Sequence, residues 1–148
     1  MTGVRPRALD HVGLKVSDMD RSLRFYCEGL GLELLRRSDK GPGMASAVIR
    51  IGNQEMNLFS DPAFGVPQAG GNPTGMDHFC LEVGNESIED LVAALSRAGI
   101  AVAKGPTRRS DGVSLFVSDP DGVRVELIVK GPCRPRPGMT RSVEAKPH

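Results

Sequence analysis

The chain has 148 residues, of which 39% are hydrophobic and 25% charged, and its formal net charge at pH 7 is +1. These values suit one globular domain or two small fused halves, and the balanced charge gives no electrostatic reason to bind nucleic acid or an anionic membrane. The apolar runs are far shorter than the roughly 20 residues that cross a bilayer. The first ten residues carry charge but no apolar stretch, so no secretory signal is expected. Three cysteines without paired spacing indicate reduced thiols in the cytoplasm.

The first predicted module, residues 7–60, opens with the strand-like stretch LDHVGLKV. Its apolar residues recur at every second position, so His11 and Gly13 point away from the core. Ser17 or Asp18 can cap a helix that follows and closes near the sequence GLG. Turn signals then separate three further predicted strands, at about 32–37, 45–51 and 54–60.

Residues 61–75 are rich in Pro and Gly and are predicted to link this module to a second one, residues 76–130. The second module opens with MDHFCLEV, which repeats the Asp-His-x-x-Leu-x-Val pattern of the first and places His78 at the equivalent position. A helix capped by Ser87 and ended by Gly99 is expected next. Strands follow at about 100–104, 113–118 and 123–129, the last two joined by the turn sequence SDPDG.

Each module has the predicted order β-α-β-β-β, and one such module leaves a face of its four-stranded sheet bare. We expect an α+β fold in which two βαβββ modules form a curved eight-stranded mixed sheet, with the helices outside and a trough inside. Residues 131–148 contain several prolines and scattered basic residues, and they are predicted to be a flexible tail.

Four residues point into this trough by the same period-two reasoning: His11, Asn57, His78 and Glu126. Two neutral imidazoles and one carboxylate make a divalent-metal site with open positions. Glu126 supports this interpretation because a carboxylate among apolar neighbours is costly without a cation. We therefore expect one divalent ion (Fe, Mn, Zn, Ni or Co) on His11, His78 and Glu126. Asn57 is expected as a fourth ligand or as a hydrogen-bonding neighbour.

Further residues are expected to line the trough because they lie on the same faces of the predicted strands. They are Gly13, Glu55, Phe59, Cys80, Ser114, Phe116 and Arg124. A single strand histidine is more often structural than functional, and Cys80 is interpreted most simply as a small buried thiol. The repetition of the histidine is what favours a site. No residue is nominated as the general base.

Three phrases occur in order along the chain: DHVGLKVSDMDRSLRFYCEGLGLELL, DHFCLEV and SDPDGVRVELI. With them the sequence, over about residues 8–130, resembles the vicinal oxygen chelate superfamily of glyoxalase I, bleomycin resistance proteins and extradiol dioxygenases. The resemblance implies paired βαβββ modules and metal ligands at His11, Asn57, His78 and Glu126. It also implies a metal that acts as a Lewis acid on two substrate oxygens, and a homodimer whose sites can draw ligands from both chains.

The resemblance leaves the reaction class open between three branches of the family. Extradiol dioxygenases use a His-His-Glu set, although the tyrosine that they place ten residues before the glutamate is Phe116 here. Glyoxalase I-like enzymes need a carboxylate where this sequence has Asn57. Fosfomycin-type thiol transferases have a cation-binding loop that resembles SDGVS at residues 110–114, but they carry a threonine where this sequence has Gly13.

We therefore expect a cytoplasmic, dimeric, divalent-metal-dependent enzyme for a small oxygen-chelating substrate, dioxygenase-like by its His-His-Glu set. A glyoxalase I-like lyase or isomerase is the alternative, followed by a fosfomycin-type thiol transferase. A metal-free protein that binds or sequesters a small molecule is the alternative from another class. Neither nucleic acid nor a membrane is expected as a partner.

Overall fold

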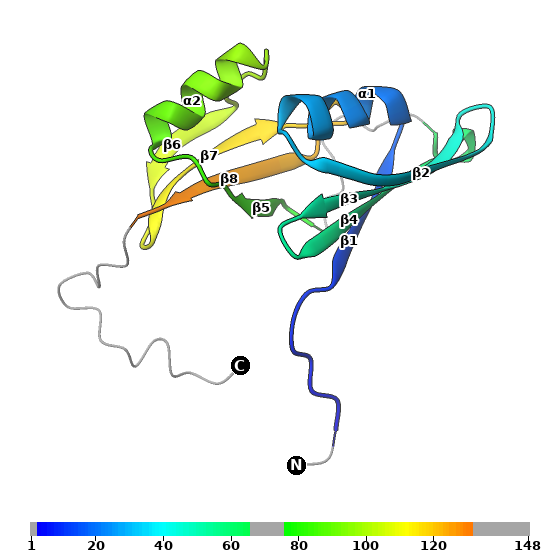
Figure 1. Cartoon of the computed structure of the whole chain (residues 1–148), viewed down its shortest axis with the longest axis horizontal. Coiled ribbons are helices and arrows are strands. Elements are labelled where there is room, and N and C mark those ends of the chain that lie inside the picture. The colour runs from blue at the N-terminus through cyan, green and yellow to red at the C-terminus, as the bar shows by residue number, and fades with distance from the viewer. Residues whose placement is uncertain (1–2, 66–75, 132–148) are drawn as a thin grey trace. The chain divides into compact units, whose positions relative to one another are not determined.

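The computed structural model describes residues 3–65 and 76–131, and the chain divides into two compact units (Figure 1). The first unit comprises Met1–Met76 with Asp119–Val123, and the second comprises Asp77–Ser118 with Arg124–His148. No helix in the described ranges is long and apolar enough to cross a membrane. Nearly all of the predicted tail and most of the predicted linker lie outside the described residues.

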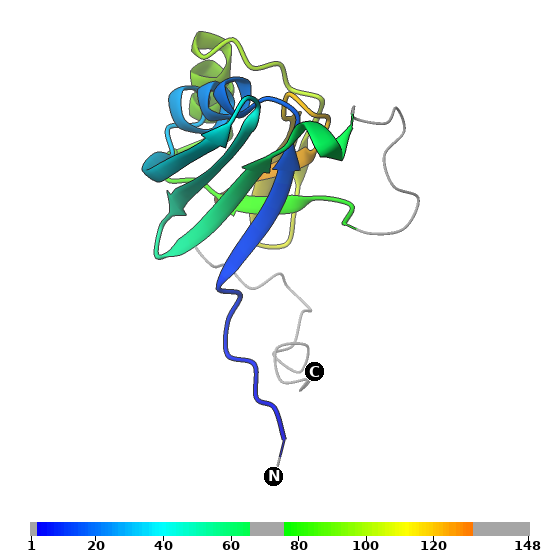
Figure 2. The ribbon, with the colours of Figure 1, turned by 90° about the vertical axis from the view of Figure 1, so that its right-hand side faces the viewer.

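The first unit is a four-stranded sheet with one helical segment. Its strands are β1 (His11–Val16), β2 (Glu33–Gly41), β3 (Met44–Ile51) and β4 (Gln54–Ser60), in the order β1-β4-β3-β2. β1 runs parallel to β4, whereas the other neighbours are antiparallel (Figure 2). α1 (Met19–Leu23) continues into a π-helical segment, η1 (Arg24–Gly29), and α1 contacts β3 and β4. A short 3-10 turn, η2 (Pro62–Phe64), follows β4.

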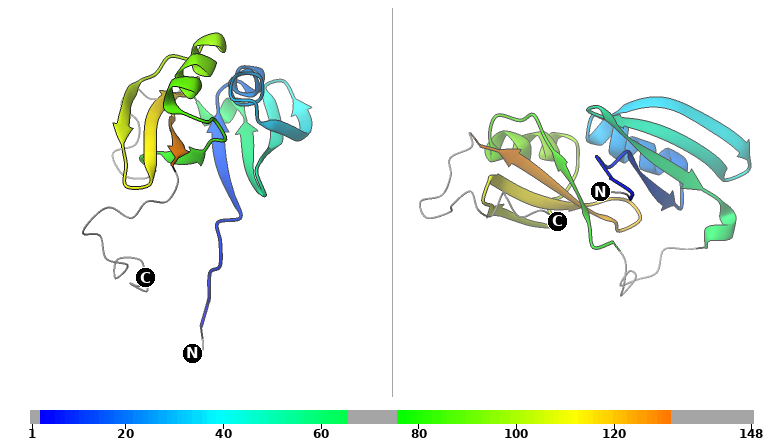
Figure 3. Two further views of the ribbon diagram at one scale, coloured as in Figure 1. Left: turned by 60° about the vertical axis from the view of Figure 1, so that its left-hand side comes forward. Right: turned by 90° about the horizontal axis from the view of Figure 1, so that it is seen from below.

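The second unit repeats this plan. Its strands are β5 (Phe79–Glu82), β6 (Lys104–Arg108), β7 (Gly112–Ser118) and β8 (Arg124–Lys130), in the order β5-β8-β7-β6, with β5 parallel to β8. α2 (Ile88–Arg97) lies along one face of this sheet (Figure 3). The predicted α+β fold of two βαβββ modules is confirmed. The single eight-stranded sheet is corrected, because the hydrogen-bonded strands of each module form a four-stranded sheet of their own.

Strand alternation explains which face of each sheet forms the core. In β1, Leu14 and Val16 are buried while His11 is exposed, as predicted. Tyr26 of η1 and Ile49 of β3 are fully buried in the same core. Each large apolar side chain stabilises the fold by about 1.5–3 kcal/mol through burial, so the opposite, more polar faces remain for binding. The core of the second unit includes Leu81, Leu91, Leu95, Leu115, Val117, Val125 and Leu127.

Both α-helices begin at a residue that the sequence predicts as a cap. Oδ1 of Asp18 accepts a hydrogen bond from the backbone N–H of Arg21 at 3.0 Å, and Oγ of Ser87 accepts one from Asp90 at 3.0 Å. Each cap satisfies a donor that the first turn of a helix leaves unpaired. Ser17, the alternative cap of the first helix, instead donates its hydroxyl hydrogen bond to another carboxylate, in the turn after β7.

The predicted strand at residues 100–104 is wrong, because the chain there completes the end of α2. The backbone N–H of Ile100 donates to the carbonyl of Leu95 at 2.9 Å. Gly99 has φ +71°, the left-handed conformation that this kind of helix end requires, and its predicted role is confirmed. Ile100 therefore closes the helix, whereas the backbone N–H of Ala103 already donates to the carbonyl of Phe116 on the neighbouring strand at 2.7 Å, and β6 starts at Lys104.

Gly112 opens β7 where the backbone of this strand lies against β8. A Cβ at this position would stand 2.2 Å from the carbonyl oxygen of Val129 and 2.9 Å from Cα of Lys130. Gly112→Ala is expected to destabilise the fold by about 1–3 kcal/mol, because the backbone of β8 would have to move. Gly84→Ala, whose Cβ would meet nothing within 4 Å, is the control. Equal melting temperatures for the two variants in a thermal unfolding experiment would contradict this expectation.

The turn that joins β7 to β8 belongs to the first unit and is held there by the buried Asp119. The carboxylate of Asp119 accepts a hydrogen bond from the hydroxyl of Tyr26 at 2.7 Å. It also accepts bonds from the backbone N–H groups of Asp121 at 2.9 Å and Val123 at 2.8 Å. Burial and the charge of Asp119 raise the pKa of Tyr26, so its hydroxyl remains a donor. The predicted SDPDG turn is confirmed, and it also completes the surroundings of Tyr26.

Candidate metal centre

The strand registers place Asn57 and Glu126 at equivalent positions in the two sheets. Gly13 of β1 pairs with Asn57 of β4, and Cys80 of β5 pairs with Glu126 of β8. Gly13 and Cys80 each lie two residues after a histidine of the repeated phrase, so that histidine points to the same face of the sheet. The glutamate of the second module therefore corresponds to an asparagine in the first.

His78 and Glu126 are the predicted ligands that the second unit brings together. Nε2 of His78 lies 3.0 Å from Oε2 of Glu126, and only 5% of the Glu126 side chain is exposed. Two donor atoms that are each about 2.1 Å from one ion, at about 90° to each other, are about 3.0 Å apart. The pair has the separation that two ligands of one divalent ion need, and a buried carboxylate favours a cationic neighbour.

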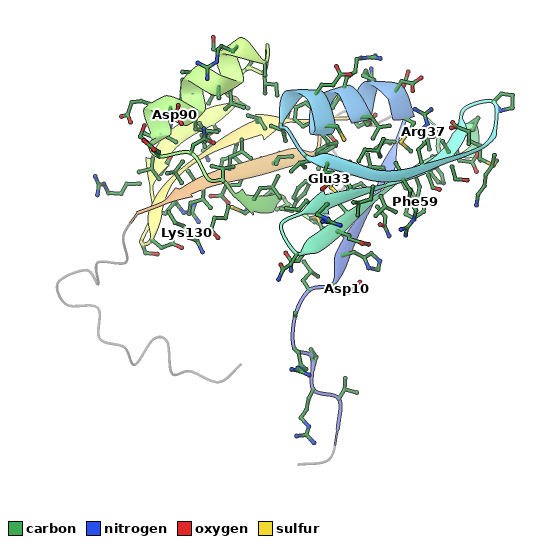
Figure 4. The ribbon with its side chains drawn as sticks, viewed as in Figure 1. Asp10, Glu33, Arg37, Phe59, Asp90 and Lys130 are labelled. Carbon is green, nitrogen blue, oxygen red and sulfur yellow. The ribbon has the colours of Figure 1, made fainter. Side chains whose placement is uncertain are left out.

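An aspartate precedes each repeated histidine and contacts the other ring nitrogen. Nδ1 of His78 lies 2.6 Å from the carboxylate of Asp77, and Nδ1 of His11 lies 2.7 Å from that of Asp10, which is labelled in Figure 4. The hydrogen bond from His78 and the charge of Arg124 hold the pKa of Asp77 below its usual value. A proton kept on Nδ1 leaves the lone pair on Nε2, as in metal-binding histidines.

In the first unit, His11 shares a sheet face with four other predicted site residues: Gly13, Glu55, Asn57 and Phe59. The register pairs His11 directly with Glu55, so an acid faces this histidine two residues before Asn57 on β4. Oδ1 of Asn57 is buried and has no hydrogen-bond partner among the described residues. A buried acceptor without a partner is costly, and a cation or a substrate hydroxyl would satisfy it. Phe59 (labelled in Figure 4) is exposed on the same face of β4.

Three predicted trough residues surround the acid of the second unit. Cys80 of β5 and Phe116 of β7 are the cross-strand neighbours of Glu126. The Phe116 ring lies edge-on to the ring of His78, with centroids 5.2 Å apart. The guanidinium carbon of Arg124 lies 4.7 Å from the centroid of the same Phe116 ring. Phe116 therefore helps to fix the plane of the imidazole and binds a cationic side chain on its face.

Arg109 is a neighbour of Glu126 that the sequence pattern does not predict. Its Nη1 lies 3.5 Å from Oε1 of Glu126, the oxygen that faces away from the contact with His78. Arg109 stands in the turn between β6 and β7, where strand alternation predicts no side-chain direction. The only available signal was a pair of adjacent arginines before SDG. Ser114, predicted to line the site, has a buried Oγ with no partner among the described residues.

Within either unit, the described residues bring no third His, Cys, Asp or Glu into a metal-binding group. His78 and Glu126 belong to the second unit, whereas His11 and Asn57 belong to the first. The three-residue ligand set therefore stays a prediction. What the second unit does provide is an imidazole and a buried carboxylate at ligand separation, and these donors suit a divalent ion.

Cys80 is exposed rather than buried as expected, because it lies on β5, an edge strand of its sheet. Two causes raise the pKa of the Cys80 thiol to about 11. The larger is partial burial of the thiol, and the second is the negative charge of the neighbouring Glu126 carboxylate. The thiolate is the reactive form, so alkylation of Cys80 by iodoacetamide in metal-stripped protein is expected to accelerate only as the pH approaches that value. The Glu126→Gln variant should accelerate at lower pH. Mass spectrometry of the Cys80 peptide measures the rate, and identical pH profiles in the two proteins would contradict the assigned cause.

Comparison with known proteins places most of the chain in one family model. The model of the Glyoxalase/Bleomycin resistance protein/Dioxygenase superfamily matches residues 8–127. A Synechocystis protein named "Probable lactoylglutathione lyase" is 34% identical over 124 residues, which cover 80% of this chain and 92% of that protein. Glutathione transferase FosA of Serratia marcescens is 33% identical over 125 residues, which cover 83% and 81%.

Other relatives are longer than this chain. A lactoylglutathione lyase of Arabidopsis thaliana is 31% identical over 126 residues, which cover 82% of this chain and 44% of that protein. The chain thus spans less than half the length of the plant relatives that it matches. Among solved structures, the glyoxalase family protein from Enterococcus faecalis has a TM-score of 0.68 and 27% identity, covering 82% of this chain and 97% of that one. The resemblance predicted from three sequence phrases is confirmed.

Proposed function

Because the chain belongs to the glyoxalase/bleomycin resistance protein/dioxygenase superfamily, we propose that it is a divalent-metal-dependent enzyme for a small substrate that chelates through two oxygens. The observation that carries this proposal is the contact at 3.0 Å between Nε2 of His78 and the buried carboxylate of Glu126. A divalent ion held there would supply Lewis-acid polarisation of the substrate oxygens.

In this proposal His11, His78 and Glu126 hold the metal, and Asn57 offers a fourth ligand. The buried, unpartnered Oδ1 of Asn57 and the matching strand registers of the two modules support this assignment. We propose that the protein is a cytoplasmic homodimer. The ligands of one metal ion come either from a single chain or from both chains of the dimer.

The other side chains orient the ligands and limit the chemistry. Asp77 keeps the proton of His78 on Nδ1, and the edge of Phe116 restrains the ring. Asn57 has no carboxylate and does not accept a proton at ordinary pH, so a reaction that removes a proton from carbon needs another base. Glu55, paired with His11 across β1 and β4, is the acid on that face available for this role.

Dioxygenase-like chemistry is the reaction class that we propose first. In this case Asn57 would be a hydrogen-bonding neighbour and not a ligand, so that His11, His78 and Glu126 alone would hold the metal and leave room for a chelating substrate and oxygen. This chemistry does not need a carboxylate at Asn57. Catechol-2,3-dioxygenase of Bacillus subtilis is a relative with 27% identity over 128 residues. Glutathione-dependent chemistry is the second candidate, since two of the relatives that align along most of their own length are named "Probable lactoylglutathione lyase" and "Glutathione transferase FosA".

Metal titration tests the proposal directly. Metal-stripped protein is titrated calorimetrically with Mn(II) or Zn(II). His11→Ala and His78→Ala are each expected to weaken binding by more than the roughly 10- to 100-fold cost of losing an outer-shell partner. His148→Ala, at the third histidine of the chain, is the matched control. Wild-type affinity in both ligand variants would refute the proposed site.

A substrate panel separates the reaction classes. Oxygen uptake on catechols with Fe(II)-loaded protein supports the dioxygenase, and turnover of a glutathione hemithioacetal supports the lyase. Conjugation of glutathione to an epoxide supports a thiol transferase. Tight binding of a small molecule by metal-stripped protein, with no turnover, would support a sequestering protein instead. An equal mixture of His11→Ala and Glu126→Gln chains that regains activity would show that sites are shared between two copies.

A further inference from the structure

Glu126 divides its two carboxylate oxygens between two partners. Oε2 faces Nε2 of His78 at 3.0 Å, and Oε1 faces Nη1 of Arg109 at 3.5 Å. The Glu126 side chain is 5% exposed, whereas the Arg109 side chain is 48% exposed. The buried acid therefore has a cationic partner that stays open to solvent.

A second carboxylate on this face is also paired with an arginine. Asp77, which contacts Nδ1 of His78, lies 3.2 Å from Nη1 of Arg124. The two carboxylates that contact the imidazole are thus each matched by a guanidinium. A divalent ion added to His78 and Glu126 would keep much of its positive charge, so a ligand that brings negative charge would be favoured.

The guanidinium of Arg109 suits such a ligand. It carries five N–H donors in a planar fork that matches a carboxylate. Among the described residues, Glu126 is the one carboxylate within 4 Å of it. Their contact is longer than the about 2.7–2.9 Å of a strong charge-assisted hydrogen bond, so donors of Arg109 remain available to a ligand beside the metal.

We propose that the site takes small chelating oxyanions and that Arg109 selects their negative charge. The ligand class is a dianion of the 1,2-dicarboxylate type, which would have one oxygen of each carboxylate for the metal and an outer oxygen for the guanidinium. The inference rests on the proposed function because it requires the metal. If Arg109 served only to neutralise Glu126, its loss would change the affinity for the metal but not the dependence of ligand binding on ligand charge.

Oxalate, oxamate and oxamide test this inference, because they are similar in shape and chelating oxygens but carry two, one and no negative charges. Each is titrated calorimetrically into Mn(II)-loaded protein. Arg109→Gln is expected to weaken oxalate binding by about 10- to 100-fold, the loss expected for a charge-assisted hydrogen bond, and oxamide binding by less than about 2-fold. Arg109→Lys keeps the positive charge but lacks the planar N–H donors of a guanidinium. Its affinity for oxalate is expected to lie between those of the wild type and Arg109→Gln.

Arg108→Gln is the matched control, because it removes the same charge from the neighbouring, exposed residue of β6. Its affinities for the three ligands are expected to keep the wild-type ratios. Equal losses for oxalate and oxamide in Arg109→Gln would overturn this inference and leave the proposed function standing. Wild-type protein that binds no Mn(II) would overturn the proposed function and this inference with it.

Discussion

Glu126→Gln is expected to weaken Mn(II) binding by about 100-fold or more, beyond the cost of losing an outer-shell partner, without unfolding the protein. Glutamine has nearly the same shape as glutamate, but its neutral amide is a poor ligand for a divalent ion. The side chain is 5% exposed, so little water can replace the lost carboxylate oxygen. The variant also removes a buried negative charge. Its partner Arg109 is about half exposed, so water can replace the lost contact to the guanidinium. The melting temperature of the metal-free variant is therefore expected to equal or exceed that of the wild type.

Glu82→Gln is the matched control for this variant. Glu82 lies on β5, on the same sheet face as Cys80, but its side chain is exposed and its charge is paired with Lys130 at 3.8 Å. Calorimetric titration of both variants with Mn(II) measures the difference, and thermal unfolding checks the fold. Equal affinities in Glu82→Gln and Glu126→Gln would contradict the role of Glu126 as a ligand.

Asp119→Ala is expected to lower the free energy of unfolding by about 3 kcal/mol, the largest stability effect that we expect outside the apolar core. The variant removes the acceptor of three hydrogen bonds, two of them from backbone N–H groups of its own turn. It also leaves the hydroxyl of Tyr26 buried without its acceptor, which costs about 1–3 kcal/mol by itself. For a chain of this length the melting temperature should fall by roughly 6–12 °C.

Asp119→Asn separates the hydrogen bonds from the charge. Burial, the largest cause, raises the pKa of Asp119 above its usual value, although its hydrogen bonds oppose this shift. A carboxyl with a raised folded-state pKa binds its proton more tightly in the fold. Its contribution to stability is therefore fully present at low pH and declines as the pH rises through the folded-state pKa. As the pH rises through that pKa, the free energy of unfolding of the wild type should fall relative to that of Asp119→Asn. Chemical unfolding of both proteins at several pH values measures this difference. A constant difference across pH would contradict the burial of the charged form.

The parts of the fold that depend on local pattern were predictable from the sequence. The alternation in β1 depends only on the period of a strand, so the burial of Leu14 and the exposure of His11 follow without tertiary information. The caps at Asp18 and Ser87 likewise depend on side chains next to the helix start. The repeat added the long-range information, because equal modules must place Asn57 and Glu126 at equivalent points of their sheets.

Other features were not predictable because they depend on contacts distant in the sequence or on irregular backbone. Ile100 has the apolar character of a strand residue, yet its N–H is used to end α2. Arg109 lies in a turn, where no periodicity says which way a side chain points, and only the folded chain shows that it reaches Glu126. The exposure of Cys80 follows from the position of β5 at a sheet edge, which composition does not reveal.

The turn between β7 and β8 has a consequence for any attempt to divide this chain. Cutting the linker after the first module would yield an N-terminal fragment without Asp119, and its Tyr26 would lack the carboxylate that accepts its hydroxyl hydrogen bond. The C-terminal fragment would carry that carboxylate away from its partner. Although the two modules repeat one design, they are therefore no longer interchangeable halves. We expect the separated fragments to fold poorly alone and to regain structure when mixed, as the pieces of a split protein do.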